Sequence, residues 1–157
     1  MKEIQELYRM YSKDVYKFVL SMSLDKEIAQ DIMQNTFLSA IKSLHTFKGK
    51  SSIKTWLIAI AKNEYYKYIK KNPLNKSMYD INIREIHYND KHNDEIKERY
   101  KSILEIISKL EEPQRQVMIL RLINEFSFKE IGEAIGKSEN YCRVIFFREK
   151  KKLIEKI

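Results

Sequence analysis

The sequence has 157 residues, of which 43% are hydrophobic and 33% are charged, a balance typical of a soluble, helix-rich protein. Three glycines and two prolines are too few for an all-β fold with many tight turns, and the single cysteine excludes an internal disulfide. No apolar run approaches bilayer-spanning length, and Met1 opens directly into an amphipathic pattern. We therefore expect no signal peptide and a cytoplasmic location.

The net charge of +8 is unevenly distributed along the chain. Residues 42–71 carry eight basic groups and one acidic group, net +7, and residues 113–157 carry ten and six, net +4. The segments 1–41 and 72–112 are slightly acidic, at net −1 and −2. Two separated basic blocks predict two separate contacts with an anionic partner.

Residues 1–71 have the periodicity of three amphipathic helices. Apolar residues recur at intervals of three and four, which places them on one face of each helix. Asp25 is positioned to cap the second helix, and Ser52, after a polar loop that starts at His45, is positioned to cap the third. We expect the three apolar stripes to bury one another in one small domain. They consist of Ile4, Leu7, Tyr8, Tyr11, Val15, Phe18, Val19 and Met22, then Ile28, Ile32, Phe37, Ala40, Ile41 and Leu44, then Ile53, Trp56, Leu57, Ile60 and Ala61.

Between residues 72 and 94 the periodicity is lost, and Asn and Asp interrupt the few apolar residues, as in a mobile linker. Order resumes in a second domain, residues 95–157, where Pro113 suits the first turn of that domain's second helix. The apolar positions of its first two helices are Ile96, Tyr100, Ile103, Leu104, Ile107 and Leu110, then Val117, Leu120 and Ile123. The expected fold is all-α, with two small helical domains joined by a flexible linker.

A helix-turn-helix is predicted at the end of the chain, formed by Phe128–Ile135 and Glu139–Leu153. Ser127 opens a capping-box pattern, Gly136 ends the shorter helix, and Ser138 is positioned to cap the longer one. A short helix, a glycine-containing turn and a longer basic helix together indicate a DNA-binding module.

The longer helix carries residues suited to reading duplex DNA. Residues 137–152 contain six basic and two acidic groups, and a basic face gains affinity when it releases counterions from phosphates. Arginine can form a bidentate pair of hydrogen bonds with guanine, and asparagine can do so with adenine. The candidate base-contacting residues are Asn140, Tyr141, Arg143, Val144, Phe147 and Arg148. The alternative is a helical hairpin whose charges are merely solvated.

Two small residues in this module are expected to serve packing. Gly132, inside the shorter helix, lowers the stability of that helix by about 1 kcal/mol relative to alanine. This loss is explained if the two helices need close contact there. Cys142 is interpreted as a small packing residue rather than a redox switch.

The end of the third predicted helix combines lysine with tyrosine. Lysines attract phosphates, and tyrosine rings can stack on unpaired bases for about 1–3 kcal/mol each, which suits a partly opened duplex. The preceding loop, residues 45–54, could hold one extruded base. Any single tyrosine could equally belong to the core. The candidate DNA-contacting residues of the loop and helix are Lys48, Lys50, Lys62, Asn63, Tyr65, Tyr66 and Lys67.

Three segments, in the order in which they occur along the chain, resemble the sigma-70 family of RNA polymerase sigma factors, and most closely its extracytoplasmic-function type. Asp31–Ala40 resembles the segment with which that family grips the polymerase clamp. Phe47–Gly49 and Thr55–Asn63 resemble the promoter-melting helix and its loop. The resemblance to the distal promoter-reading domain is carried by Leu110, Arg115–Arg121, Ser127–Ile135, Ser138 and Arg143–Lys152. It covers nearly the whole chain except residues 72–94, where the family also has a variable linker.

The chain departs from the family pattern at a few positions. Asn35 stands where the family often has Glu, and Gly132 stands where a small Ala is usual. Lys70 and Lys71 occupy positions where Arg is frequent, and lysine cannot make the forked contacts of arginine. These departures bear on affinity and promoter preference rather than on the fold.

The resemblance implies that the chain docks on the RNA polymerase core and reads a promoter in two places. Asp31, Gln34 and Leu38 would bind polymerase from the outer side of the second helix. The last helix would read the distal promoter element as duplex, and the third would hold the melted non-template strand of the proximal element. An anti-sigma factor, frequently membrane-bound, is a further implied partner. No cofactor, metal ion or small-molecule substrate is required.

An enzyme is the least favoured class, because His45, His87 and His92 are scattered and no phosphate-binding loop or nucleophile–base set occurs. The main competitor is a stand-alone helix-turn-helix regulator with an N-terminal sensing or dimerisation bundle. The Asp31–Ala40 segment and the basic, aromatic third helix argue against it, because a reader of closed duplex needs neither. A purely protein-binding helical module would show no salt-dependent affinity for nucleic acid.

Overall fold

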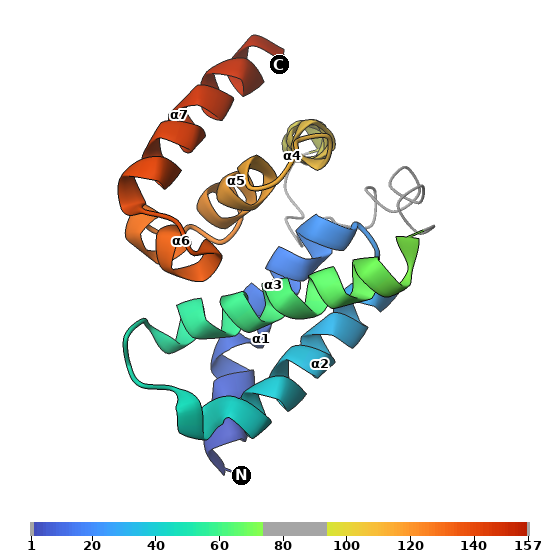
Figure 1. Cartoon of the computed structure of the whole chain (residues 1–157). Helices are drawn as coiled ribbons and strands as arrows, with labels where there is room; N and C mark the ends of the chain where they lie inside the picture. Colours follow the sequence, from blue (N-terminus) through green and yellow to red (C-terminus); the bar gives the residue numbers. More distant parts are fainter. Residues whose placement is uncertain (1, 74–93, 157) are drawn as a thin grey trace.

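The computed structural model describes residues 2–73 and 94–156, and every regular element in these ranges is a helix (Figure 1). The expectation of an all-α fold with two helical regions is confirmed. Of the linker expected over residues 72–94, residues 74–93 lie outside the described residues, and Asp94 is the first residue of α4. The elements are α1 (Lys2–Ser23), α2 (Lys26–Ser43), the 3-10 helix η1 (Leu44–Thr46), α3 (Ile53–Lys71), α4 (Asp94–Ser108), α5 (Gln114–Leu122), α6 (Phe128–Ile135) and α7 (Glu139–Lys156).

Helices α1, α2 and α3 form the N-terminal bundle, whose centre is filled by the apolar stripes of all three helices (Figure 1). Phe18, Ile32 and Leu57 are each at most 1% exposed. Burial of an aliphatic or aromatic side chain of this size contributes about 1.5–3 kcal/mol. Tyr8, placed on the same stripe, stays 43% exposed, because it packs edge-on against Phe37 at the margin of the bundle.

The two helix starts predicted in this bundle are confirmed. The Asp25 carboxylate accepts hydrogen bonds from the backbone N–H groups of Glu27 and Ile28, at 2.9 and 3.0 Å. The Ser52 hydroxyl accepts the backbone N–H of Thr55 at 3.1 Å. Each cap satisfies donors that the first turn of a helix otherwise leaves unpaired, for about 1 kcal/mol. These caps fix where α2 and α3 begin.

Helices α4 to α7 form the C-terminal bundle, in which α6 and α7 pair as a helix-turn-helix (Figure 1). Ser127 and Glu130 form the expected capping box, and Gly136 ends α6 in the left-handed conformation, with φ of +76°. The Ser138 hydroxyl accepts the backbone N–H of Tyr141 at 3.0 Å at the start of α7. Cys142 is fully buried between the helices, as expected of a packing residue, and burial raises the pKa of its thiol.

Gly132 lies where the backbone turns back on α6. Its carbonyl accepts the N–H groups of Gly136 and Lys137, both at 2.9 Å, and a Cβ on Gly132 would stand 2.5 Å from the Lys137 carbonyl oxygen. The close contact inferred from the sequence is present, although its partner is the backbone of the turn. We expect Gly132→Ala to destabilise the C-terminal bundle by about 1 kcal/mol net, because backbone displacement outweighs the roughly 1 kcal/mol gain in helix propensity.

Urea unfolding followed by circular dichroism measures this change. Glu133→Ala, an exposed substitution on the same helix, is the control and should alter the free energy of unfolding by no more than about 0.5 kcal/mol. A Gly132→Ala protein as stable as the parent would show that the turn relaxes without cost.

Candidate nucleic-acid and polymerase-binding surfaces

One face of α7 is presented to solvent along its first three turns. Asn140, Arg143, Val144, Phe147 and Arg148 are exposed and recur at the three- and four-residue spacing of one helix face. The opposite face is buried in the bundle. The exposure of Val144 and Phe147, at 45% and 52%, is unusual for apolar side chains and leaves them available to a thymine methyl group or another apolar partner. Tyr141 is half-buried, with the Lys137 ammonium 5.3 Å from its ring centroid.

An aromatic cluster between α6 and α7 packs behind this exposed face. The rings of Phe146 and Phe147 have centroids 5.4 Å apart, and Phe128 of α6 lies 5.5 and 6.0 Å from them. The Arg143 guanidinium stands 5.4 Å from the Phe128 centroid and 3.3 Å from the Glu139 carboxylate. Because these contacts restrict Phe147 and Arg143, the face loses less side-chain entropy when it binds a partner.

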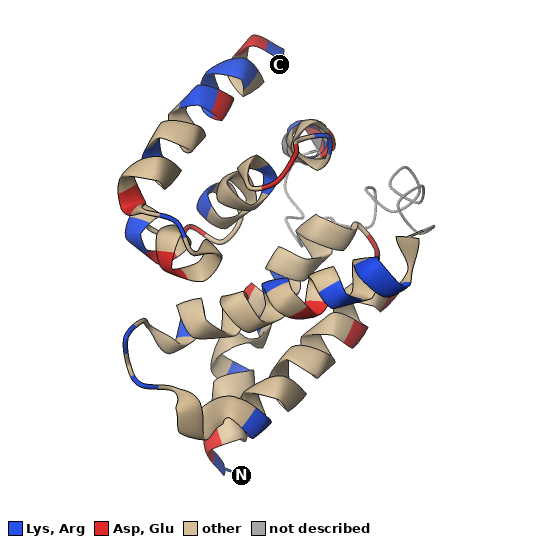
Figure 2. Cartoon of the chain, in the orientation of Figure 1, with Lys and Arg blue, Asp and Glu red and all other residues tan. Residues whose placement is uncertain are grey.

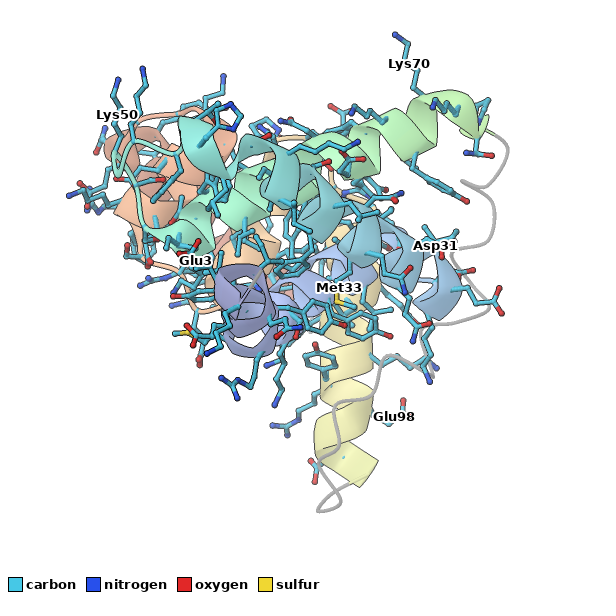
Figure 3. All side chains as sticks on the ribbon, turned by 90° about the horizontal axis from the view of Figure 1, so that it is seen from below. Glu3, Asp31, Met33, Lys50, Lys70 and Glu98 are labelled. Atoms are coloured by element: carbon cyan, nitrogen blue, oxygen red, sulfur yellow. The ribbon has the colours of Figure 1, made fainter. Side chains whose placement is uncertain are left out.

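The α2 residues expected to dock on polymerase also share an exposed face. Asp31, Gln34 and Leu38 are all exposed, with Leu38 at 56%, whereas Met33 and Phe37 turn into the core. Asp31 and Met33 leave the helix in different directions (Figure 3). A large apolar side chain beside a carboxylate and an amide is typical of a protein-binding surface. The structure brings the three candidates together.

Basic residues run from the loop before α3 to its last turn (Figure 2). Lys50 and Lys70 lie near its two ends (Figure 3). Lys48 is exposed beside Lys50 on the loop, and Asn63 and Lys67 are exposed between Lys50 and Lys70. The outward side chains of α3 border an open groove between α2 and α3. The Lys62 side chain is half-buried, and this burial lowers the pKa of its ammonium group.

Glu64 lies in the middle of this basic surface, and sequence reasoning did not single it out. Its carboxylate accepts the Ser39 hydroxyl at 2.8 Å and stands 3.4 Å from the Lys67 ammonium. Both partners come from the walls of the groove, so the carboxylate ties α2 to α3. In the sequence, the spacing of three residues between Glu64 and Lys67 on one helix indicates their ion pair.

The two adjacent tyrosines of α3 have different environments. Tyr65, expected among the DNA-contacting residues, is only 2% exposed, and its hydroxyl donates to the Met22 carbonyl oxygen at 3.2 Å. In this structure it is a core residue with no surface for a base. Its spacing of four residues from Ala61 and eight from Leu57, both buried, would have indicated this.

Tyr66 is half-buried at the edge of the same surface. Its hydroxyl forms a hydrogen bond with the Gln116 side-chain amide of α5. Desolvation and the neighbouring Glu112 carboxylate raise the pKa of Tyr66, outweighing the opposite effect of Arg115. The side chain is therefore a neutral phenol across the physiological pH range, able to stack without repelling phosphate.

The loop before α3 is partly structured. The expected loop over residues 45–52 begins within η1, and Phe47 packs on Trp56 with ring centroids 5.1 Å apart. Gly49 adopts a left-handed conformation, with φ of +73°, at the tip between the exposed Lys48 and Lys50. An aromatic anchor at the base of a short loop holds its two lysines beside the start of α3.

Among residues 2–73 and 94–156, no group of three or more metal-ligating side chains is assembled. His45 is exposed after α2, while His87 and His92 lie outside the described residues. In the same ranges, no helix has both the length and the apolar character needed to cross a membrane.

An exposed recognition helix in a helix-turn-helix, together with a second basic helical surface, defines a DNA-binding protein of the helix-turn-helix class. Comparison with known proteins agrees. Residues 7–73 match the model of sigma-70 region 2, and residues 100–153 match that of sigma-70 region 4. The second basic surface thus lies in region 2 and the helix-turn-helix in region 4.

Curated relatives extend this match over most of the chain. The chain is 32% identical to the ECF RNA polymerase sigma factor SigM of Bacillus subtilis over 154 residues, covering 96% of this chain and 92% of the relative. It is 31% identical to SigX of the same organism, covering 87% and 74%. The chain belongs to the sigma-70 family of RNA polymerase sigma factors, in its extracytoplasmic-function (ECF) branch.

A solved structure shares the fold. The sigma factor RpoE from Bartonella quintana, determined in complex with the anti-sigma factor NepR, superposes with a TM-score of 0.77 at 22% identity, covering 99% of this chain and 96% of that one. The family membership establishes a non-enzymatic protein that directs promoter-specific transcription initiation through regions 2 and 4. The match to region 2 sets aside the stand-alone regulator as an alternative.

Proposed function

We propose that the chain performs promoter-specific initiation through three surfaces, the first of which docks on the RNA polymerase core. This docking surface comprises Asp31, Gln34 and Leu38 of α2. Their joint exposure on one helix face carries the proposal, because these side chains do not contribute to the core. Burial of Leu38 would contribute about 1.5–3 kcal/mol, and the two polar groups would set the orientation of the complex.

The second surface holds the melted non-template strand of the proximal promoter element. Lys62, Asn63, Tyr66 and Lys67 of α3 supply phosphate attraction, hydrogen bonding and one stacking ring, and we exclude Tyr65 because it is buried. Lys48 and Lys50 flank the loop tip, where an extruded base would be captured.

The third surface reads the distal promoter element as duplex in the major groove. It consists of the exposed face of α7, and its contacts divide by chemistry. Arg143, Arg148 and Asn140 make hydrogen bonds to base edges, and Val144 and Phe147 make apolar contacts. Tyr141, close to the Lys137 ammonium, lies at the margin of this face and contacts the sugar-phosphate backbone of the DNA. We propose domains at residues 1–71 and 95–157, joined by residues 72–94. The support is that α3 ends at Lys71 and α4 begins at Asp94.

A further partner in this proposal is an anti-sigma factor. The support is that RpoE, which shares the fold, was determined in complex with one. The chain would act in the cytoplasm, where polymerase and promoter are found, and a membrane-bound anti-sigma factor would hold it at the membrane.

Run-off transcription tests the proposed function. Purified bacterial core polymerase with this protein should initiate at defined sites in the DNA of the source genome, whereas core polymerase alone should give only non-specific transcripts. Start sites that are identical with and without the protein would overturn the proposal. Co-migration with core polymerase on gel filtration provides a second readout that is independent of promoter choice.

A further inference from the structure

The only acidic residue between residues 42 and 71 lies among the basic residues of α3 (Figure 2). This residue is Glu64, whose side chain is only 13% exposed. Its Oε1 atom accepts the Ser39 hydroxyl at 2.8 Å and stands 3.4 Å from the Lys67 ammonium. Both contacts use this one oxygen, and among the described residues nothing donates to Oε2. The carboxylate therefore keeps one oxygen available to a ligand.

Glu64 lies in the groove between α2 and α3, which has a volume of about 580 Å³. Pockets for small molecules commonly enclose about 300–1,000 Å³, so the groove is large enough for one nucleobase. Ser39 and Ser43 supply hydroxyl groups from α2, while Ile60 and Tyr66 supply apolar surface from α3. Hydrogen-bonding groups beside a stacking surface are what an unpaired base requires.

A role in folding alone does not account for the charge of Glu64. The Ser39 hydroxyl bond ties α2 to α3, but a neutral amide in the same place would accept this hydroxyl equally well. A partly exposed ion pair such as Glu64–Lys67 adds little to stability. A carboxylate also repels phosphate, so on a basic surface it weakens the attraction for the backbone of a strand. This loss is offset if the carboxylate accepts a hydrogen bond from a base.

Glu64 and Lys67 together present an acceptor next to a donor. The acceptor is Oε2 of Glu64, and the donor is the Lys67 ammonium, whose side chain is 67% exposed and has three N–H groups. Cytosine and adenine present the complementary pair, an exocyclic amino group next to a ring nitrogen that accepts. Thymine and guanine present a carbonyl oxygen next to a ring N–H, which would place acceptor against acceptor and donor against donor. The pair therefore favours cytosine and adenine.

We propose that the groove between α2 and α3 is a pocket for one unpaired amino base (cytosine or adenine), and that Glu64 selects this base together with Lys67. The inference rests on the proposed role of α3 in holding the melted non-template strand, and it adds a base-reading site to that surface. The site is separate from the loop tip near Lys50, because Lys70, which lines the groove, lies near the opposite end of the basic surface (Figure 3). Lys70 is placed to hold a phosphate next to the captured base.

Matched single strands test this selection on the free, full-length chain. Oligodeoxycytidine and oligodeoxyuridine of about 12 nucleotides differ only in the hydrogen-bonding groups at C4 and N3 of each base. Oligodeoxyadenosine and oligodeoxyinosine differ in the same way at C6 and N1. Fluorescence anisotropy should show that the parent chain binds the amino strand of at least one pair about tenfold more tightly. The pair with the larger ratio identifies the base as cytosine or adenine.

The variant Glu64→Gln tests the residue itself. An amide presents a donor as readily as an acceptor, so the ratio of affinities should fall to about twofold or less. The bond from Ser39 is kept, because the amide oxygen accepts it, and circular dichroism checks that helical content is retained. Glu6→Gln makes the same chemical change on the exposed surface of α1 and should keep the parent ratio. Ratios are compared because loss of a negative charge strengthens binding to every strand.

Transcription by the complex with core polymerase provides a second readout. On premelted templates, each position of the non-template strand in the proximal element carries cytosine, uracil, adenine or hypoxanthine in turn. One position should favour the amino base of a pair. Glu64→Gln should remove the preference at that position and at no other.

Two outcomes overturn the inference. The first is equal affinity of the parent chain for both members of each pair, or binding to none of the strands. The second is a Glu64→Gln chain that keeps the parent ratio, because another group would then read the base. Failure of the proposed function is seen separately, as the absence of start-site choice in run-off transcription with the parent protein. The strand affinities of the free chain would still report on the groove in that case.

Discussion

Replacing Asp31 or Gln34 by alanine is expected to abolish promoter-specific transcription while leaving the helical content of the protein unchanged. Both side chains are exposed on α2 and are not part of the core, so the free energy of unfolding should change by no more than about 0.5 kcal/mol. Central interface residues typically contribute about 2 kcal/mol or more, which weakens core binding by about 30-fold for each substitution. At limiting protein concentration, such a loss leaves polymerase without its promoter-reading subunit.

The measurements are core-polymerase affinity, run-off transcription and far-ultraviolet circular dichroism on each variant. Glu6→Ala and Gln5→Ala remove a carboxylate and an amide from the exposed face of α1 and serve as controls. Normal promoter-specific initiation by both the Asp31→Ala and the Gln34→Ala proteins would contradict the docking role. A loss of helicity would instead indicate a structural role for these residues.

The second large effect is expected on the recognition helix. Arg143→Ala and Arg148→Ala should each weaken binding to the distal promoter element by about 1–3 kcal/mol, or roughly 5- to 160-fold, and relax base preference at one position. Arg143→Lys should recover only part of this loss, because lysine keeps the charge but not the forked geometry. Lys151→Ala removes an exposed charge beyond the base-reading turns. This substitution should weaken binding to all DNA sequences equally. It should also reduce the slope of log affinity against log salt concentration by about one.

Fluorescence anisotropy of the polymerase complex on promoter duplexes, with single base-pair changes in the distal element, separates these outcomes. If Arg143→Ala and Arg148→Ala lowered affinity equally for every sequence, both side chains would be phosphate contacts. If neither substitution changed affinity, the exposed face of α7 would not be the reading surface. Arg143 also pairs with Glu139, so Glu139→Gln is a control for loss of that surface ion pair.

Much of the local structure could be predicted from the sequence. The caps at Asp25, Ser52 and Ser127, and the left-handed end of α6 at Gly136, all occur where the residue types indicated. A cap is a hydrogen bond between residues two or three positions apart, so its energy depends on neighbours in the chain. For the same reason, the order of helices, the helix-turn-helix and the exposed faces of α2 and α7 followed from helical periodicity.

Only the tertiary structure decided the hydrogen-bond partners of Tyr65 and Tyr66. Both are amphipathic, so either could be core or surface on composition alone. The Tyr65 hydroxyl finds its acceptor 43 residues away in Met22, and Tyr66 finds Gln116 50 residues away. The contact between the bundles is decided in the same way, because it depends on groups from distant parts of the chain. Helical periodicity states which face of a helix is apolar, whereas the partner of a polar side chain depends on which helices finally lie against it.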